Sequence, residues 1–157
     1  MLDEVRNVLN GEPYHVGIVV EDVGAAMEEY GALFGVQWGQ RRKAEFPVEL
    51  RGTRRTLRFD SVFATSGPVR VELTVQKPDT FWRAGGGMHH LGFWSDDPMA
   101  DSRRLTAAGY EEEARLFPFP DDPVASVAFH RGPQGIFVEL VSSTMRAGSE
   151  AGWSAPA

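Results

Sequence analysis

The chain has 157 residues, a formal net charge of −6, and 42% hydrophobic and 24% charged residues, which is the composition of one ordinary globular domain. The negative charge argues against non-specific binding to nucleic acid or anionic lipid, and the absence of cysteine excludes disulfides, thiolate metal sites and a cysteine nucleophile. Apolar runs fall short of the ~18–20 residues of a membrane helix, and residues 1–4 lack the apolar region of a secretory signal. We therefore expect a single domain over residues 1–157, located in the cytoplasm, with neither membrane nor nucleic acid as a partner.

The first half of the chain predicts a strand, a helix and three further strands. A β-branched run at 14–20 leads into Asp22, which can cap a helix, and the amphipathic pattern over 23–34 stops at Gly35. Strand-like runs follow at 37–43, 56–65 and 69–76. This half is expected to form one βαβββ module over residues 13–77.

The second half repeats this order after a linker at 78–87. A strand at 89–95 precedes a helix at 98–108 that stops at Gly109, and strand-like runs follow at 112–118, 124–131 and 136–142. We expect a second βαβββ module over 88–143. The remaining segment, 144–157, is a tail of small residues with little reason to order.

Two short motifs recur in both halves. The segment HVGIVVED at 15–22 corresponds to HLGFWSDD at 90–97, an offset of 75, and VEL at 71–73 corresponds to VEL at 138–140, an offset of 67. The change of offset places about eight extra residues in the first half, around residues 51–55. Matching anchors in the same order indicate two copies of one unit and an α+β fold.

Strand alternation puts two histidines and two glutamates on one face. The apolar side chains of each strand share the other face, which we expect to pack under the helices, so His15, Glu72, His90 and Glu139 meet if the sheet curves around a cleft. Alone, such a histidine is more often structural and such a glutamate solvated, but the same pair in both halves favours a shared site. Imidazole and carboxylate form a ligand set for Zn²⁺, Fe²⁺, Ni²⁺, Co²⁺ or Mn²⁺. Four ligands around a six-coordinate ion leave two positions for water or a chelating substrate.

The sequence resembles the vicinal oxygen chelate superfamily of glyoxalases, bleomycin-resistance proteins and dioxygenases. The resemblance rests on HVGIVVED at 15–22, GGGMHHLGF at 85–93 and GIFVEL at 135–140, and it spans residues 13–143. It implies two tandem βαβββ modules that form a cupped, incomplete barrel around a divalent metal ion. The ligand positions of that family lie on the first and last strands of each module, which here again are His15, Glu72, His90 and Glu139.

Neighbouring histidines compete for one ligand position. The repeat aligns His90 with His15, so His90 is the expected ligand and His89 is expected to turn toward the helix-packed side; a one-residue shift would exchange them. Retention of both glutamates resembles glyoxalase I and methylmalonyl-CoA epimerase rather than extradiol dioxygenases, which use two histidines and one glutamate. Superfamily members often pair, so the resemblance also implies a homodimer.

The resemblance predicts a metal-dependent isomerase, epimerase or lyase that acts on a small-molecule carbonyl substrate through an enolate, with the metal ion as Lewis acid. Glu139 is the expected base. Epimerisation requires a second acid or base on the opposite face of the carbon, and Glu45 and Glu49 are the available carboxylates, against the alternative that they are solvated loop residues.

Three further residues are candidates for substrate contact. Trp94 and Phe137 share a face with the predicted ligands and are expected to line the pocket. His130 stands near a hairpin end and is the third candidate, against the alternative of a surface position.

Two other functions fit the same sequence. An extradiol-type dioxygenase would need Fe²⁺ and a carboxylate free to leave the metal, and oxygen consumption with catechols would identify it. A metal-free binding or resistance protein would sequester a hydrophobic or aromatic compound, and metal analysis of the purified protein would separate it from both enzymes.

Overall fold

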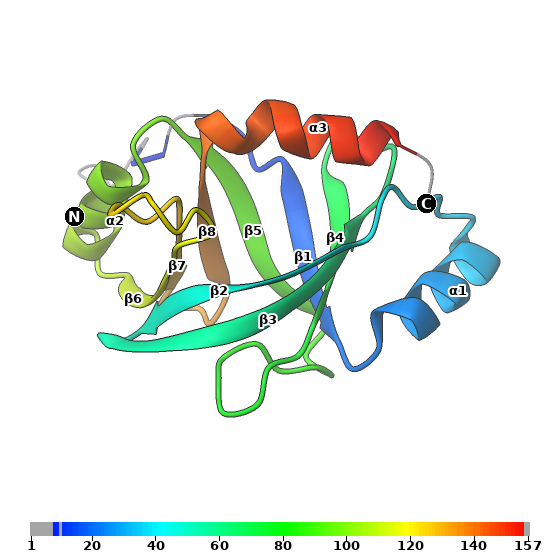
Figure 1. Ribbon diagram of the computed structural model, residues 1–157, viewed down its shortest axis with the longest axis horizontal. Helices are drawn as coiled ribbons and strands as arrows, with labels where there is room; N and C mark the ends of the chain where they lie inside the picture. Colours follow the sequence, from blue (N-terminus) through cyan, green and yellow to red (C-terminus); the bar gives the residue numbers. More distant parts are fainter. Residues whose placement is uncertain (1–7, 10, 156–157) are drawn as a thin grey trace.

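The computed structural model describes residues 8–9 and 11–155, which contain eight strands and three α-helices (Figure 1). The first half contains β1 (His15–Val20), α1 (Val23–Phe34), β2 (Arg42–Leu50), β3 (Thr53–Phe63) and β4 (Arg70–Val75). The second half contains β5 (Met88–Ser95), α2 (Pro98–Ala107), β6 (Glu111–Leu116), β7 (Val127–Arg131) and β8 (Phe137–Ser142). A 3₁₀ helix, η1 (Ser143–Met145), and α3 (Arg146–Ser154) follow. The order of one strand, one helix and three strands therefore occurs twice.

Both predicted helices are confirmed. Asp22 caps α1 by accepting a hydrogen bond from the backbone N–H of Ala25 at 2.9 Å, and Gly35 ends the helix in the left-handed conformation, with φ 69°. Asp97 caps α2 in the same way, accepting from the backbone N–H of Ala100 at 3.0 Å. Within the described residues, no helix combines the length and the apolar character needed to span a membrane.

The prediction of a strand at 37–43 is wrong. β2 begins only at Arg42, and Trp38 makes no more than an isolated bridge to Ala64. The residues that the repeat marks as extra lengthen two strands instead, because β2 and β3 form a long hairpin that turns at Arg51 and Gly52, both at positive φ. This hairpin accounts for the greater length of the first half.

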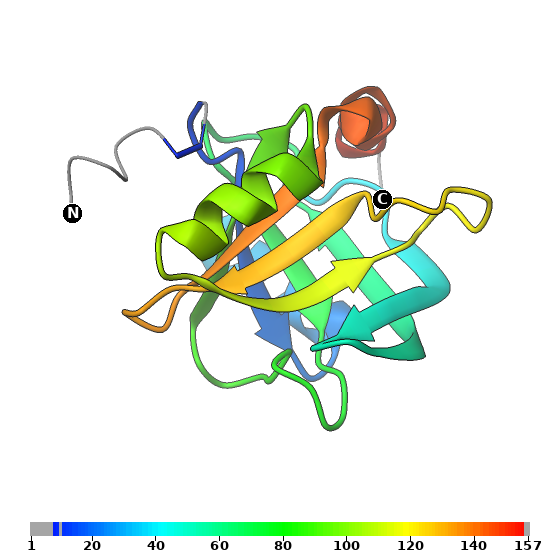
Figure 2. The same cartoon turned by 90° about the vertical axis from the view of Figure 1, so that its left-hand side faces the viewer.

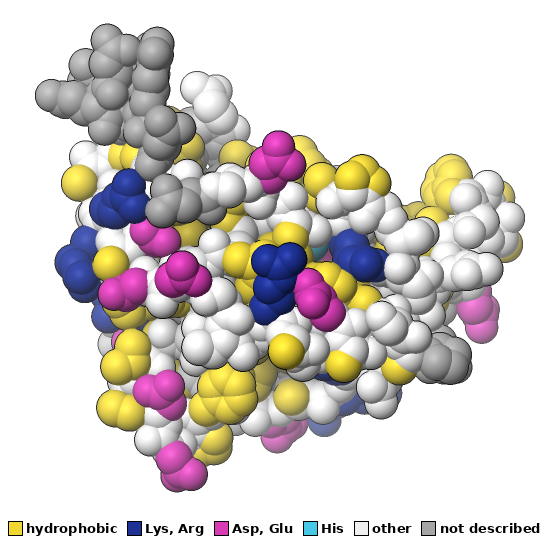
Figure 3. Space-filling model, turned by 90° about the horizontal axis from the view of Figure 1, so that it is seen from above, with side chains coloured by type: hydrophobic (Ala, Val, Ile, Leu, Met, Phe, Trp, Pro, Cys, Tyr) yellow, Lys and Arg dark blue, Asp and Glu magenta, His cyan; other side chains and the backbone are white. Residues whose placement is uncertain are grey.

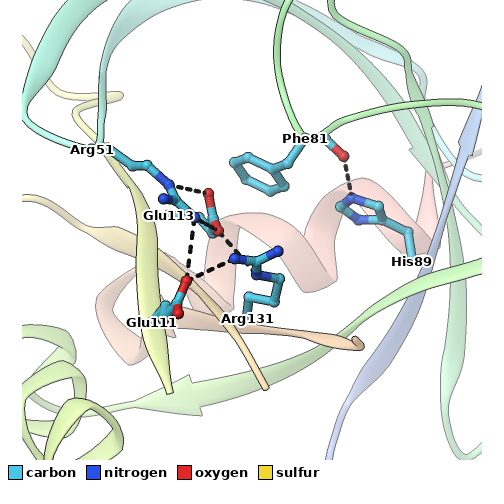
Figure 4. Close-up of polar contacts among 6 residues, drawn as sticks. All are labelled: Arg51, Phe81, His89, Glu111, Glu113 and Arg131. Carbon is cyan, nitrogen blue, oxygen red and sulfur yellow. Dashed lines mark hydrogen bonds and ion pairs between the residues drawn. The ribbon is translucent and has the colours of Figure 1, made fainter. Parts of the chain in front are cut away.

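The eight strands form a closed ring in the order β1-β4-β3-β2-β6-β7-β8-β5, which corrects the expectation of an incomplete barrel. The ring closes because the long β2 reaches β6, with Val48 opposite Leu116. Ion pairs cover this junction: Arg51 and Arg131 both contact the buried carboxylate of Glu113, at 2.5 and 3.3 Å (Figure 4). Side chains that point inward from the strands therefore share one enclosed space.

Helices α1 and α2 cover the outside of the barrel, and a separate apolar cluster fills part of its inside. Val23 and Ala26 of α1 pack on the outward face around Leu73, and Leu105 of α2 packs on the outward face around Leu140 (Figures 1 and 2). The inner cluster consists of Val19, Val48, Leu57, Trp82, Ala114, Leu116, Val127, Phe129 and Val141. The apolar face that the sequence assigned to helix packing is confirmed for β1, β4, β5 and β8.

The segment at 78–87 joins β4 to β5 and also closes one end of the barrel. Trp82 is 1% exposed, and its ring meets Phe59 and Phe129 edge-on at 5.8 and 5.3 Å. Thr80 holds this segment in place, since its hydroxyl accepts from the backbone N–H of Trp82 and donates to the carbonyl of Lys77. The predicted linker is thus part of the core.

The prediction that the tail has little reason to order is wrong for its described part. Helix α3 lies across the other end of the barrel (Figures 1 and 2), and Trp153 near its end is 7% exposed. The Trp153 ring contacts Tyr14 and Phe63 at 5.8 and 5.5 Å, and the guanidinium of Arg70 lies over it at 4.5 Å. One large aromatic side chain among small residues anchors the helix, because a buried indole removes a large apolar area from water.

A close backbone contact at α3 predicts an asymmetry between two glycine substitutions. A Cβ on Gly39 would lie 2.7 Å from the carbonyl oxygen of Gly152 and 3.0 Å from Cα of Trp153, whereas a Cβ on Gly148 of α3 would meet nothing within 4 Å. We expect Gly39→Ala to lower the free energy of unfolding by about 1–3 kcal/mol through overpacking. Gly148→Ala, the matched control, should leave it unchanged or raise it by up to about 1 kcal/mol through helix propensity. Urea unfolding measures both, and equal effects would contradict a tightly docked α3.

Candidate metal centre

Four neighbouring strands of the barrel, β4, β1, β5 and β8, carry the four predicted ligand residues. His15 begins β1 and Glu72 lies in β4, which pairs with β1 in parallel; His90 lies in β5 and Glu139 in β8, which form the second parallel pair. Both histidines are 1% exposed, and both glutamate side chains are 13% exposed. All four point inward, opposite to the face under α1 and α2.

Two glycines make room for the two imidazole rings. In the antiparallel pairing of β1 with β5, His15 stands opposite Gly92 and His90 stands opposite Gly17. A Cβ on Gly92 would overlap the His15 ring, and a Cβ on Gly17 would overlap the His90 ring. Each half therefore supplies the histidine that fills the space over the glycine of the other half.

The two glutamates stand beside these same glycines. Glu72 is the parallel neighbour of Gly17, and Glu139 is the parallel neighbour of Gly92. The histidine that lies over each glycine therefore meets the glutamate beside it. Nε2 of His15 lies 2.7 Å from Oε2 of Glu139, and Nε2 of His90 lies 3.1 Å from Oε2 of Glu72.

The ligand atoms converge on one point. Five of the six pairs are 2.7–3.2 Å apart, and all four atoms lie within 4.8 Å of one another. Around an octahedral ion with bonds of about 2.1 Å, adjacent ligand atoms are about 3.0 Å apart. Oε2 of Glu139 is buried without meeting hydrogen-bond geometry to any partner, although Nε2 of His15 is close. Spacing and chemistry of the donor set both fit a divalent cation.

The carboxylates also set the protonation of the histidines. Burial alone would lower the pKa of His15, but the neighbouring Glu139 and Glu72 carboxylates outweigh burial and raise it to about 9. Burial of Glu139 acts to raise its pKa, yet the two histidines hold it below the usual value. Without a cation the cluster is held together by protons, so binding of a divalent ion must displace them and becomes stronger as pH rises.

His89 contacts His90 and does not turn toward the helices, which corrects that prediction. A register shift in the pairing of β5 with β1 brings Nδ1 of His89 to 2.8 Å from Nδ1 of His90. Nε2 of His89 lies 3.0 Å from the carbonyl oxygen of Phe81, as Figure 4 shows. Because a carbonyl only accepts, His89 donates through Nε2, and its Nδ1 accepts from Nδ1–H of His90. Once the protons of the cluster are displaced, this arrangement leaves the lone pair of His90 on Nε2, the atom that faces Glu72.

The centre opens into a cavity of about 340 Å³ inside the barrel. Its walls are mainly aromatic and aliphatic, and its polar lining apart from the four predicted ligands comes from Tyr14, Arg42, Ser61, Thr74 and Ser149. Helix α3 and η1 contribute Ser149 and Met145 to the wall. A mainly apolar cavity with a few converging polar groups is the usual form of a small-molecule site.

Glu45 and Glu49 do not line this cavity, which argues against the acid or base role predicted for them. They alternate along β2 with Ala44, Phe46 and Val48, which face inward, and therefore point outward. Glu45 lies 3.5 Å from Arg58 and Glu49 lies 3.7 Å from Arg54 on the outer face of the hairpin.

None of the three predicted substrate contacts lines the cavity. Trp94 stacks on Tyr14 at 3.9 Å, one layer behind the wall, and Phe137 stacks on His89 at 4.7 Å near the opposite end. His130 is fully buried beneath α2, where Nε2 lies 2.9 Å from the hydroxyl of Ser102. For His130 both the substrate contact and the surface alternative are wrong, because alternation along β7 turns it outward.

Sequence reasoning did not identify four residues that shape the site. Gly17 and Gly92 could have been recognised from the sequence, because in each half the glycine follows the predicted histidine ligand by two positions. Among the described residues that line the cavity, Arg42 is the only arginine or lysine, and its inward position depends on the register of β2. Lys77 is 4% exposed behind the wall, with Nζ 4.3 Å from the centroid of the Phe59 ring, and burial lowers its pKa to about 8. Nothing in the sequence around Lys77 indicates this.

Because Gly17 and Gly92 make room for the histidine rings, we predict that substituting either one lowers both stability and metal affinity. Gly92→Ala forces a methyl group into the His15 ring, which is boxed in by Tyr14 and Phe63 at 4.4 and 5.3 Å, so we expect lower stability by about 1–3 kcal/mol and weaker Zn²⁺ binding. Gly86→Ala is the matched control, because a Cβ there meets nothing within 4 Å. Urea unfolding and equilibrium dialysis with Zn²⁺ measure both effects. If Gly92→Ala bound Zn²⁺ as tightly as the wild type, the proposed steric role of Gly92 would be contradicted.

His130 predicts a distinct dependence of stability on pH. Burial lowers its pKa below the ordinary value of 6.5, so the folded protein binds this proton less tightly than the unfolded chain. The stability that neutral His130 provides is present above pH 6.5 and is lost as pH falls from there toward its folded pKa. His130→Gln removes this proton, so between about pH 7.5 and 5.5 the variant should lose less stability than the wild type, by on the order of 1 kcal/mol. Urea unfolding at a series of pH values measures the difference, and parallel profiles would contradict a neutral buried His130.

Comparison with known proteins supports the fold. The model of the glyoxalase/bleomycin resistance protein/dioxygenase superfamily matches residues 14–129. A hypothetical protein from Bacillus halodurans is 15% identical over 84% of this chain and 94% of its own, with a TM-score of 0.56. Methylmalonyl-CoA epimerase from Mycobacterium tuberculosis is 18% identical over 90% and 97%, with a TM-score of 0.53. The Streptomyces coelicolor methylmalonyl-CoA epimerase, solved with 2-nitronate-propionyl-CoA, is 21% identical over 83% and 96%, with a TM-score of 0.51.

No curated protein matches the sequence. At these sequence identities the solved structures support the fold alone. Family membership rests on the superfamily model, which covers most of the chain. The chain belongs to the glyoxalase/bleomycin resistance protein/dioxygenase superfamily.

Proposed function

We propose that this protein is a divalent-metal-dependent isomerase, epimerase or lyase that removes the α-proton of a small carbonyl substrate and proceeds through an enolate. The observation that carries the proposal is the convergence of His15, Glu72, His90 and Glu139 at octahedral edge lengths inside an apolar cavity. Zn²⁺, Ni²⁺, Co²⁺, Mn²⁺ and Fe²⁺ all accept this ligand set. A bound divalent cation would supply positive charge that stabilises the negative charge developing on a substrate oxygen.

Glu139 is the proposed base. Its lowered pKa keeps the carboxylate ionised at neutral pH, which is the form that accepts a proton. It stands at the wall of a cavity lined mainly by aromatic and aliphatic side chains, where electrostatic interactions are stronger than in water.

The carboxylates available inside the cavity favour isomerisation among the three reactions. Among the described lining residues, Glu72 and Glu139 are the only carboxylates. Isomerisation needs one base that moves a proton between neighbouring atoms, whereas epimerisation needs an acid on the opposite face of the carbon. Glu72 is the remaining carboxylate for that second role, since Glu45 and Glu49 lie outside.

The ligand set also bears on the alternative functions. Two glutamates among four convergent ligands differ from the two-histidine, one-glutamate set expected of an extradiol dioxygenase. A metal-free binding protein would have to keep two carboxylates and two imidazoles buried together, and burying charged groups is costly even when they are paired.

We further propose that residues 13–77 and 88–143 are two copies of one unit. The pairing of Gly17 with Glu72 recurs as the pairing of Gly92 with Glu139, and both belong to parallel strand pairs. Homodimer formation and a cytoplasmic location stay predictions.

Loss of the base tests the function directly. Glu139→Gln should lower the rate of α-proton exchange with deuterated solvent by at least about 100-fold, the usual contribution of a positioned base. The measurement uses Zn²⁺- and Mn²⁺-loaded protein with a panel of pyruvate, phenylpyruvate and propionyl-CoA, followed by proton NMR and normalised to bound metal.

Glu72→Gln is the matched control, because it removes the other ligand carboxylate from the same cluster. At saturating metal it should retain more exchange activity than Glu139→Gln. Unimpaired exchange by Glu139→Gln would remove this residue as the base, and no exchange by the wild type with any metal and substrate of the panel would argue against the proposed chemistry.

A further inference from the structure

Aromatic rings line the cavity in an unbroken series that ends at the metal centre. Phe46 stacks on Phe59 at 4.1 Å, and Phe59 meets Trp82 edge-on at 5.8 Å. Trp82 in turn meets Phe129 at 5.3 Å, and Phe129 meets the His90 ring at 5.2 Å. All of these side chains line the cavity. Such a wall favours a flat apolar group, because offset and edge-to-face contacts add to the burial of ring area.

The charges around the cavity favour an anion. Two glutamates balance a divalent cation, so the loaded centre carries no net charge apart from its ligand. Arg42 lines the cavity and donates to the carbonyl of Gly148 at 2.6 Å, and Lys77 lies behind the rings of Phe59 and Trp82. Among the described residues, no carboxylate lies within ion-pair distance of either cation. Their positive potential therefore extends into the cavity and favours a substrate with one negative charge.

The cavity is compact, and few of its lining residues are exposed. Its 340 Å³ corresponds to about eleven water-sized groups. The exposed residues of its lining are Arg42, Ala44 and Phe119, while α3 and Trp82 cover the two barrel ends. Seen from the α3 side, acidic, basic and apolar side chains are interspersed, and the cations do not gather into a continuous patch (Figure 3). A coenzyme A moiety would lie largely outside such a cavity, with its phosphates on a surface of mixed charge.

We propose that the substrate is a compact aromatic 2-oxo acid, with its carboxylate and adjacent carbonyl oxygens toward the four ligand groups and its ring against Phe46 and Phe59. This inference rests on the proposed function, since the two oxygens require the metal centre. It replaces the thioester suggested by the epimerase neighbours with a substrate that the walls of this chain fit.

Binding of phenylglyoxylate tests the substrate class. This compound has the two vicinal oxygens and a ring but no hydrogen on the carbon next to its carbonyl, so it cannot be turned over by proton removal. We expect Zn²⁺-loaded protein to bind it about 10- to 100-fold more tightly than glyoxylate, which lacks the ring. Isothermal titration with phenylglyoxylate, glyoxylate and propionyl-CoA measures the order. Equal affinity for the first two, or tighter binding of propionyl-CoA, would overturn the proposal.

A pair of variants locates the effect. Phe46→Leu should weaken phenylglyoxylate binding by about 5- to 10-fold and change glyoxylate binding less than about twofold, because only the ring contact is reduced. Phe34→Leu is the matched control, since Phe34 is 71% exposed at the end of α1. It should change neither affinity, and an equal loss for both ligands in Phe46→Leu would contradict a ring-specific wall.

The outcome separates this inference from the proposed function. Tight phenylglyoxylate binding without α-proton exchange of any substrate in the panel would support the substrate class and overturn the enolate chemistry. Exchange of the pyruvate protons without preferential binding of the ring compounds would support the enolate chemistry and overturn the substrate class. Failure of the protein to bind Zn²⁺ or Mn²⁺ at all would overturn both.

Discussion

An imidazole ring crosses the inside of this barrel only where the paired strand carries no side chain, and the site depends on that steric constraint. Gly92 faces His15 and Gly17 faces His90, so each ring lies over the bare backbone of the strand beside it. The glutamate on the next strand then lies beside the ring, with Oε2 of Glu139 2.7 Å from Nε2 of His15 and Oε2 of Glu72 3.1 Å from Nε2 of His90. In each half, a His-x-Gly sequence and a glutamate on the neighbouring parallel strand thus supply half of the centre. The two halves of the centre face each other.

Closure of the barrel gives this arrangement its chemical character. Because β2 reaches β6 and the ring is complete, the four ligand groups lie in a space walled by strands and covered by Trp82 at one end and α3 at the other. Charges held there interact more strongly than at the surface. The same closure turns the long hairpin, whose residues 51–55 the sequence marked as an insertion, into a wall that supplies Phe46, Phe59 and Arg42.

The sequence predicted the parts of the structure that obey local periodicity. Both helices and the inward face of His15 and His90 follow from patterns of 3.6 and two residues, Asp22 was recognisable as a helix cap, and the repeat located Glu72 and Glu139. The register of β2, the closure of the ring and the docking of α3 depend on contacts between distant segments. Trp153, a single aromatic residue in a small-residue tail, shows the difficulty: its burial follows from rings and a cation contributed by β1, β3 and β4. The burial of His130 was missed for a related reason, because nothing about a polar residue near a hairpin end indicates that α2 covers it.

The direction of one strand's side chains decides which reactions remain open to the proposed centre. Had β2 been shifted by one residue, Glu45 and Glu49 would point inward and the cavity would contain carboxylates on two sides of a bound carbon. In the observed register Ala44, Phe46 and Val48 occupy those positions, so one side of the cavity is apolar and the carboxylates stand on the other. A proton removed by Glu139, the proposed base, would therefore return from the side on which it left or pass to Glu72 in the same cluster. Together with an aromatic wall opposite the ligands, this asymmetry favours isomerisation of a ring-bearing substrate over inversion of a carbon exposed to bases on both faces.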